Sequence, residues 1–142
     1  MTSTTEMKLP NSTLRRLSDT ELDVAAKAQD IRGREVRDAA NEKIGKVNDL
    51  LIDDREKRVR FLEVASGGVF GIGADKLLVP VDAVTGVEKD CVRISQSRDN
   101  VGRAPRYDPA LVDEHYLTST YTHYGYVPYW TPDYSYPTKW SI

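Results

Sequence analysis

Residues 44–52 read Ile-Gly-Lys-Val-Asn-Asp-Leu-Leu-Ile, an apolar-rich stretch with the character of a β-strand. The polar turn Asp53-Asp-Arg-Glu-Lys57 follows, and its residue types favour chain reversal in solvent. A second strand signal, Val59-Arg-Phe-Leu-Glu-Val64, comes next, and strict alternation places Val59 and Phe61 on one face. The two strand signals and the turn together predict an antiparallel hairpin.

The first strand of this hairpin does not keep a strict two-residue period. Ile44 and Val47 are both apolar, yet perfect alternation points them to opposite faces. One extra residue in the strand brings both side chains to the same side. We therefore expect a β-bulge near Asn48 or Asp49.

Three more short strand signals follow, at Leu77–Val81, Val84–Val87 and Cys91–Ile94. Pro80 lacks an N–H group, so its strand is expected at an edge or at the end of a ladder. The polar turn 88–90 joins the last two strands and again favours an antiparallel hairpin. A two-sheet sandwich needs more strands than roughly 80 residues easily supply. The chain is therefore predicted to be mainly β, with one small, closed antiparallel barrel.

Four segments in this order resemble the PRC-barrel domain: Asp30–Val36, Glu42–Leu50, Val59–Val64 and Leu78–Ala83. The stretch Ser97–Asp108 is similar to the tailpiece that follows the barrel in free-standing bacterial members. The domain is shared by the photosynthetic reaction-centre H subunit and the ribosome maturation factor. The resemblance implies a β-barrel that binds partners rather than catalysing a reaction.

The chain divides into three parts on this interpretation. Residues 1–29 are expected to be a flexible N-terminus with a short helix, which a capping box at Ser18–Glu21 begins. Residues 30–108 form the barrel. Residues 109–142 are expected to be a short helix, with Pro109 at its first position, followed by a partly disordered tail rich in Tyr, Pro and Trp.

Charge and cysteine content exclude several classes of function. The net charge is −2, and the three parts carry four, fifteen and one basic residues against four, fifteen and three acidic ones. No part has the basic excess that binding to nucleic acid requires. The single Cys91 excludes an internal disulfide and a cysteine-based zinc site, and we interpret it as a small strand residue. The leading residues lack the apolar run of a signal peptide or membrane span, which favours the cytoplasm.

Two apolar features are candidates for interaction with a partner. The first is the glycine-rich tip Ser66–Gly73, whose Val69, Phe70 and Ile72 are apolar where a hairpin tip meets solvent. The second is the tail, which contains seven of the eight tyrosines and both tryptophans; its candidate contact residues are Tyr124, Tyr126, Tyr129 and Trp130. Two alternatives stay open, because the tip can fold back onto the barrel and the tail can be loosely packed without a ligand.

No catalytic, cofactor-binding or metal-binding residues are predicted. His115 and His123 lack a nearby acidic cluster and make a poor metal site. The acidic residues of 53–58 alternate with basic ones, which predicts a solvated turn of mutually neutralised charges. No Ser, Cys or Thr has a recognisable base partner in the sequence. The chain is therefore interpreted as a non-enzyme.

Three hypotheses for function follow. The favoured one is a protein–protein interaction or assembly module, which docks an unknown protein or a second copy of itself. The second is an accessory protein of a photosynthetic or electron-transport complex, similar to the reaction-centre H subunit, in peripheral contact with a membrane. The third is glycan binding or self-association through the aromatic tail.

Overall fold

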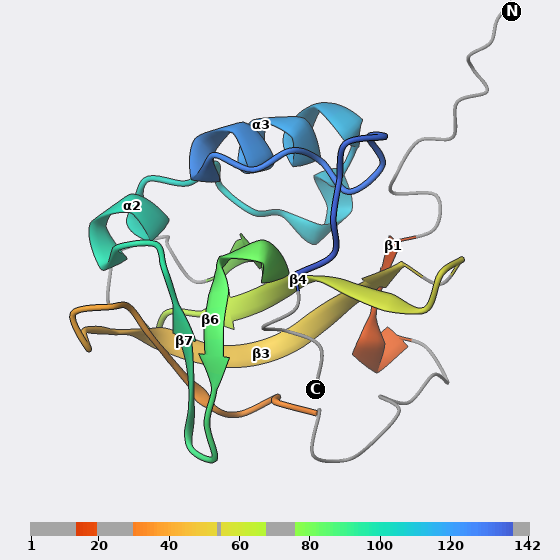
Figure 1. Cartoon of the computed structure of the whole chain (residues 1–142). Helices are drawn as coiled ribbons and strands as arrows, with labels where there is room; N and C mark the ends of the chain where they lie inside the picture. Colours follow the sequence, from red (N-terminus) through yellow and green to blue (C-terminus); the bar gives the residue numbers. More distant parts are fainter. Residues whose placement is uncertain (1–13, 20–29, 54, 68–75, 138–142) are drawn as a thin grey trace, which may run out of the picture.

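The computed structural model describes residues 14–19, 30–53, 55–67 and 76–137 (Figure 1). The strands are β1 Leu14–Arg16, β2 Glu35–Arg37, β3 Lys43–Asp53, β4 Arg58–Ala65, β5 Lys76–Pro80, β6 Val84–Val87 and β7 Cys91–Ile94. The helices are α2 Arg98–Gly102 and α3 Glu114–Tyr124, with the 3₁₀ turns η2 Leu17–Asp19, η4 Val81–Ala83 and η5 Pro109–Leu111. The mainly β class is confirmed.

The strands form one seven-stranded sheet in the order β5-β4-β3-β2-β7-β6, and β1 also pairs with β3. Two details of the predicted barrel are wrong for the described residues. The sheet is mixed, because β2 runs parallel to β7, with Val36 opposite Val92. The strand order also ends at β5 and β6 rather than closing on itself. Short turns predict hairpins, but no turn joins β2 to β7, so local sequence does not fix their relative direction.

Two bulges shape the central hairpin of β3 and β4. The register shifts between Val47 and Asp49, so Asn48 is the extra residue and the predicted bulge is confirmed. A second shift pairs Leu51 with Phe61 and Ile52 with Val59, which leaves Arg60 as an extra residue in β4.

The second bulge changes which side chains share a face of β4. Val59 packs in the same buried cluster as Leu62 and Val64, whereas Phe61 belongs to a separate cluster. The expected pairing of Val59 and Phe61 on one face is therefore wrong, because strict alternation does not allow for the extra residue at Arg60.

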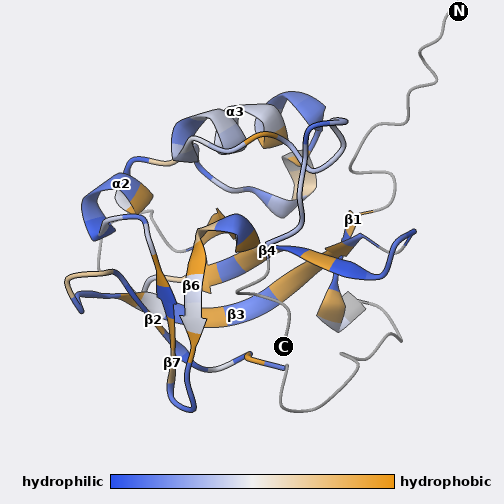
Figure 2. Ribbon diagram, viewed as in Figure 1, coloured by the Kyte–Doolittle hydropathy of each residue, from blue (hydrophilic) through white to orange (hydrophobic). Residues whose placement is uncertain are grey.

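The core has two parts, one on each side of the central strands. Hydrophobic residues concentrate along β3 and β4 (Figure 2). The larger cluster joins residues of the strands with Leu17 of η2, Val101 of α2 and Tyr124 of α3. The smaller one lies between the sheet and α3, and its buried members are Leu51, Phe61, Leu78, Tyr107, Leu117 and Tyr121. In Figure 1, α3 lies across one face of the sheet, and the dark blue segment after it runs back toward β4.

The helix in the C-terminal part begins later than expected. Pro109 starts the short turn η5, whose N-cap is Asp108, and α3 starts only at Glu114. The Asp113 carboxylate caps α3 by accepting the backbone N–H of Tyr116, at 2.8 Å. Gly125 ends the helix with φ 87°, a left-handed conformation that glycine adopts without strain.

Other local predictions can be compared directly with the structure. Pro80 is the last residue of β5, which is an end strand of the sheet, as its missing N–H predicts. Cys91 is a buried free cysteine in β7. Leu17–Asp19 forms the 3₁₀ turn η2, and most of the predicted N-terminal helix, at positions 20–29, lies outside the described residues.

Gly45 is the glycine whose replacement the fold tolerates least. A Cβ atom at this buried position in β3 would overlap with the carbonyl oxygen of Ala65 in the neighbouring strand. We expect Gly45→Ala to lower the free energy of unfolding by about 2 kcal/mol, because backbone in β4 has to move. Urea denaturation measures this loss. Gly86→Ala is the matched control, since a Cβ there meets nothing within 4 Å; equal losses in both variants would contradict the prediction.

Candidate functional site

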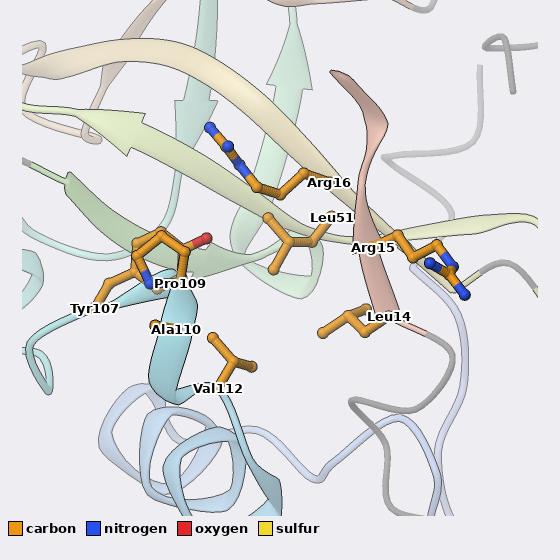
Figure 3. Close-up of a pocket in the computed structure, with 8 residues that line it drawn as sticks. All are labelled: Leu14, Arg15, Arg16, Leu51, Tyr107, Pro109, Ala110 and Val112. Atoms are coloured by element: carbon orange, nitrogen blue, oxygen red, sulfur yellow. The ribbon is translucent and has the colours of Figure 1, made fainter. Parts of the chain in front are cut away.

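A groove opens between β1 and the segment that leads into η5 (Figure 3). Its volume is about 410 Å³. The lining residues come from β1, from β3 and from residues 107–112: Leu14, Arg15, Arg16, Leu51, Tyr107, Pro109, Ala110 and Val112. Figure 3 shows Leu51 between β1 on one side and the 107–112 segment on the other. The groove therefore has the nearly buried Leu51 at its base and two arginines of β1 along one wall.

A fully buried carboxylate, that of Glu63, lies behind this groove. Nε and Nη2 of Arg16 each donate to it at 3.0 Å, forming a forked ion pair between β1 and β4. The Tyr107 hydroxyl donates at 2.9 Å, and Nδ2 of Asn48 donates at 2.5 Å. Four donors from three separate parts of the chain thus satisfy one carboxylate, which makes its burial tolerable.

The ionisation of the neighbouring groups reflects this arrangement. The hydrogen bond to Glu63 raises the pKa of Arg16, although partial burial opposes the shift. Burial, followed by the adjacent Glu63 charge, raises the pKa of the Tyr107 hydroxyl. Arg16 therefore stays charged and Tyr107 stays a neutral hydrogen-bond donor across the range in which proteins are folded.

A second buried carboxylate, Asp49, fastens the turn after β1. It accepts the backbone N–H of Ser18 at 3.2 Å and also the Ser18 hydroxyl. Nε of Arg16 lies 3.5 Å from its Oδ2 atom. Ser18, interpreted from sequence as a helix cap, thus binds a side chain of β3, and the remaining positions of that capping box lie outside the described residues. These charged contacts add to the pairing of β1 with β3 and to the burial of Leu17 in the core.

The C-terminal aromatic residues form a second feature, centred on Arg60. The Arg60 side chain is only 2% exposed, and its Nη2 atom donates to Asp53 at 3.2 Å and to Glu56 at 2.6 Å. Its guanidinium lies 4.3 Å from the ring centre of Tyr129, a cation–π contact. Burial by itself lowers the pKa of Arg60. The hydrogen bond to Asp53 and the charge of that carboxylate outweigh this effect, so the pKa of Arg60 is raised.

This arrangement corrects the expected solvated turn at 53–58. Asp53 is 4% exposed and pairs with a buried arginine, instead of being neutralised in solvent. The bulge at Arg60 is the reason, because it directs that side chain toward the turn and the C-terminal segment. One end of the turn is therefore fixed by the buried Asp53–Arg60 ion pair, whereas residues 55–58 are exposed to solvent.

An open hollow lies beside Arg60, with a volume of about 580 Å³. Its walls are Glu56, Arg58, Arg60, Tyr129, Thr131, Tyr134 and Tyr136. The Arg58 guanidinium lies 4.4 Å from the ring centre of Tyr136, whose hydroxyl donates to the Val59 carbonyl at 2.9 Å. The segment after α3 is thus joined to β4 by cation–π contacts and single hydrogen bonds.

Asp82, in η4, lies next to this cluster and supplies a pH prediction. Burial raises the pKa of its carboxyl above the reference value of 3.8, although Tyr134 and Arg60 offset part of the shift. The folded state therefore binds this proton more tightly than the unfolded state does. Its contribution to stability is complete below pH 3.8 and is lost as the pH rises through the folded-state pKa. Asp82→Asn should remove this loss, so its stability relative to wild type should increase with pH in urea denaturation between pH 3 and 7. A constant difference would contradict the prediction.

The tail residues that are predicted to contact a partner pack against the rest of the fold. Tyr124 is buried, and Tyr126 has its hydroxyl 3.0 Å from Ser95 Oγ. Tyr129 covers Arg60, and the Trp130 ring packs edge-on against Tyr121 with centroids 5.9 Å apart. Between residues 124 and 136, these side chains therefore pack against the core rather than lying loose. A role for these residues in docking stays a prediction, and Val69, Phe70 and Ile72 lie outside the described residues.

Sequence reasoning missed the charged residues that organise both features. Glu63 and Arg60 interrupt an otherwise apolar strand, and that interruption was the available signal. The partners of Glu63 could not be found in the same way, because Arg16 is 47 positions from Glu63 and Tyr107 is 44 positions away.

The fold defines a small, β-rich domain whose interior is filled by side chains and whose buried charged groups are ion-paired or accept backbone hydrogen bonds. The family model described as PRC-barrel domain matches residues 23–101, more than half of the chain, so the chain belongs to the PRC-barrel domain family. No curated protein matches the chain. Across the described ranges, no helix has the length and apolar character needed to cross a bilayer. In the same part of the chain, no group of three or more His, Cys, Asp or Glu side chains could hold a metal ion.

Proposed function

We propose that this chain is a non-catalytic protein–protein interaction or assembly module of the PRC-barrel type, and that the groove beside β1 is its docking surface. Membership in the family supports the proposal, since the family resemblance implies partner binding. The observation that carries it is the groove itself, which combines the partly exposed Leu14 and Val112 with two arginines on β1. Arginine and apolar anchors in a surface depression are typical of interface hot spots.

The chemistry behind the groove favours binding over catalysis. An acid or base catalyst needs a proton-transfer atom within reach of the substrate. The Glu63 carboxylate is fully buried and accepts hydrogen bonds from Arg16, Asn48 and Tyr107. The Tyr107 hydroxyl is committed to the same carboxylate. These groups therefore act as supports that hold the two walls of the groove in place.

Ala110 offers a direct test of the docking surface. It is exposed and lines the groove, so Ala110→Glu adds bulk and charge there without disturbing buried packing. Partners are captured with the full chain from its native host by chemical cross-linking and quantified by mass spectrometry. We expect their yield to fall about tenfold with Ala110→Glu, which corresponds to about 1.4 kcal/mol of lost binding.

The matched control is Val127→Glu, which introduces the same charge at a residue that is 48% exposed and does not line the groove. It should bind as wild type does. Circular dichroism and thermal denaturation establish that both variants are folded. An unchanged partner yield with Ala110→Glu, or an equal loss with both variants, would show that the groove is not the docking surface.

A further inference from the structure

Ser18, which directly follows the wall of the groove that β1 forms, is an exposed serine bound to a buried carboxylate. Its hydroxyl and its backbone N–H both donate to Asp49, the N–H at 3.2 Å. Phosphorylation of a serine replaces the donated proton with a phosphate group of about −2 charge. The same modification would therefore turn the attraction between Ser18 and Asp49 into repulsion.

The charges next to Ser18 already have a negative excess. Nε of Arg16 lies 3.5 Å from Asp49 Oδ2 and 3.0 Å from Glu63 Oε1, so one guanidinium serves two carboxylates. Asp49 is 1% exposed and Glu63 is fully buried, and solvent screens buried charges weakly. A phosphate on Ser18 would compete with both carboxylates for Arg16. The folded position of β1 would then be disfavoured by like-charge repulsion.

The residues before Ser18 supply a signal that a kinase can recognise. Residues 15–18 read Arg-Arg-Leu-Ser. Arginines two and three residues before a serine are the charge pattern that arginine-directed serine kinases select, because acidic side chains of the kinase bind guanidinium groups with paired hydrogen bonds. Arg15 is exposed, whereas Leu17 is 3% exposed. A kinase would therefore reach the whole signal when β1 separates from β3.

We propose that Ser18 is a phosphorylation site, and that its modification releases β1 from the sheet. The kinase transfers the terminal phosphoryl group of a nucleoside triphosphate to Ser18 Oγ. A P–O bond to Oγ forms, the bond from the terminal phosphorus to the bridging oxygen breaks, the nucleoside diphosphate leaves, and the hydroxyl proton passes to the base of the kinase. In the described part of the chain, β1 is three residues long and lies off the main strand order, so the sheet keeps its other pairings without it.

This inference rests on the proposed docking role of the groove, which it places under regulation. Leu14, Arg15 and Arg16 of β1 all line the groove (Figure 3). Release of β1 removes that wall. The phosphate makes the released state the favoured one, because it interacts unfavourably with Asp49 only when β1 is in place. The unmodified chain is then the docking form, and the phosphorylated chain is the inactive one.

Treatment of the full chain with a kinase tests recognition. The catalytic subunit of cyclic-AMP-dependent protein kinase, with ATP, should phosphorylate Ser18, and mass spectrometry of peptides locates the phosphate. Arg15→Met leaves the ion pair of Arg16 with Glu63 in place. It should be phosphorylated about tenfold more slowly, the loss expected for one charge-assisted contact. No phosphate on Ser18, or equal rates for the two chains, would overturn the proposal.

Amide hydrogen exchange tests the release of β1 without a kinase. Phosphoserine is incorporated during translation in place of Ser18, and exchange in residues 14–18 should rise about tenfold or more, because the strand opens locally. Ser18→Ala loses the hydroxyl without adding charge and should raise exchange less. Phosphoserine in place of the exposed Ser135, which lies outside the groove, should leave residues 14–18 as in wild type. Unchanged exchange with phosphoserine at 18, or an equal rise throughout β4, would contradict the release of a single strand.

The yield of cross-linked partners separates this inference from the docking proposal. We expect phosphoserine at position 18 to lower the yield about tenfold, as Ala110→Glu does, and phosphoserine at position 135 to leave it unchanged. Faster exchange at residues 14–18 with an unchanged yield would support the release of β1 and contradict docking at the groove. Unchanged exchange would contradict the release, whatever the result with Ala110→Glu.

Discussion

Tyr121→Ala is expected to lower the free energy of unfolding by about 4 kcal/mol, because it empties a fully enclosed aromatic site. The Tyr121 ring lies 5.1 Å from the ring of Phe61 in β4 and 5.9 Å from that of Trp130. It therefore connects α3 to the sheet on one side and to the C-terminal segment on the other. Its removal should loosen both contacts. Urea denaturation followed by circular dichroism measures the loss.

Tyr121→Phe is the matched control for the ring. It keeps the aromatic contacts and removes only a hydroxyl that has no hydrogen-bond partner within the protein, so it should cost no more than about 1 kcal/mol. A loss below about 1 kcal/mol for Tyr121→Ala would mean that α3 does not pack on the sheet as the structure shows. Equal losses in both variants would assign the stability to the hydroxyl rather than to the ring.

Arg16→Met is expected to be nearly as damaging, with a loss of about 3 kcal/mol. The variant keeps much of the side-chain volume but leaves the fully buried Glu63 carboxylate without its cation. Asp49, which is 1% exposed, also loses the positive charge of Arg16, whose Nε atom lies 3.5 Å from Asp49 Oδ2. An uncompensated buried charge costs far more than the net value of the intact pair, since desolvation is no longer offset.

A double-mutant cycle separates the ion pair from simple packing. Adding Glu63→Gln to Arg16→Met removes the stranded charge, so the double variant should recover part of the stability. Arg15→Met, at the exposed neighbouring position of β1, should cost less than about 1 kcal/mol. Strictly additive losses for Arg16 and Glu63 would contradict the prediction, because they would show that the two side chains do not interact.

The charged network behind the groove has a consequence for function. Arg16 lines the groove on one side and holds Glu63 on the other, so the docking wall and the buried ion pair share one residue. Tyr107 has the same double position in the opposite wall. A variant of either residue is therefore expected to change both stability and binding. Ala110→Glu is the cleaner test of docking for this reason.

Local sequence determined the strands and the turns, the bulge and the strand end that interrupt them. The apolar pattern of 44–52 and 59–64 depends only on neighbours in the chain, as do the turn between them, the bulge at Asn48 and the place of Pro80 at a ladder end. Each of these features is decided by backbone geometry over a few residues. They could therefore be predicted without knowing what the strands pack against.

Tertiary structure decided the rest. The parallel pairing of β2 with β7 and the partners of Glu63 both depend on residues far apart in the chain. The aromatic tail shows the difference most clearly. Its composition suggests loose packing, yet Phe61 of β4 and Leu78 of β5 offer apolar surface that Leu117 and Tyr121 cover. The free energy of burying that surface exists only once the sheet has formed, so no local pattern in the tail could reveal it.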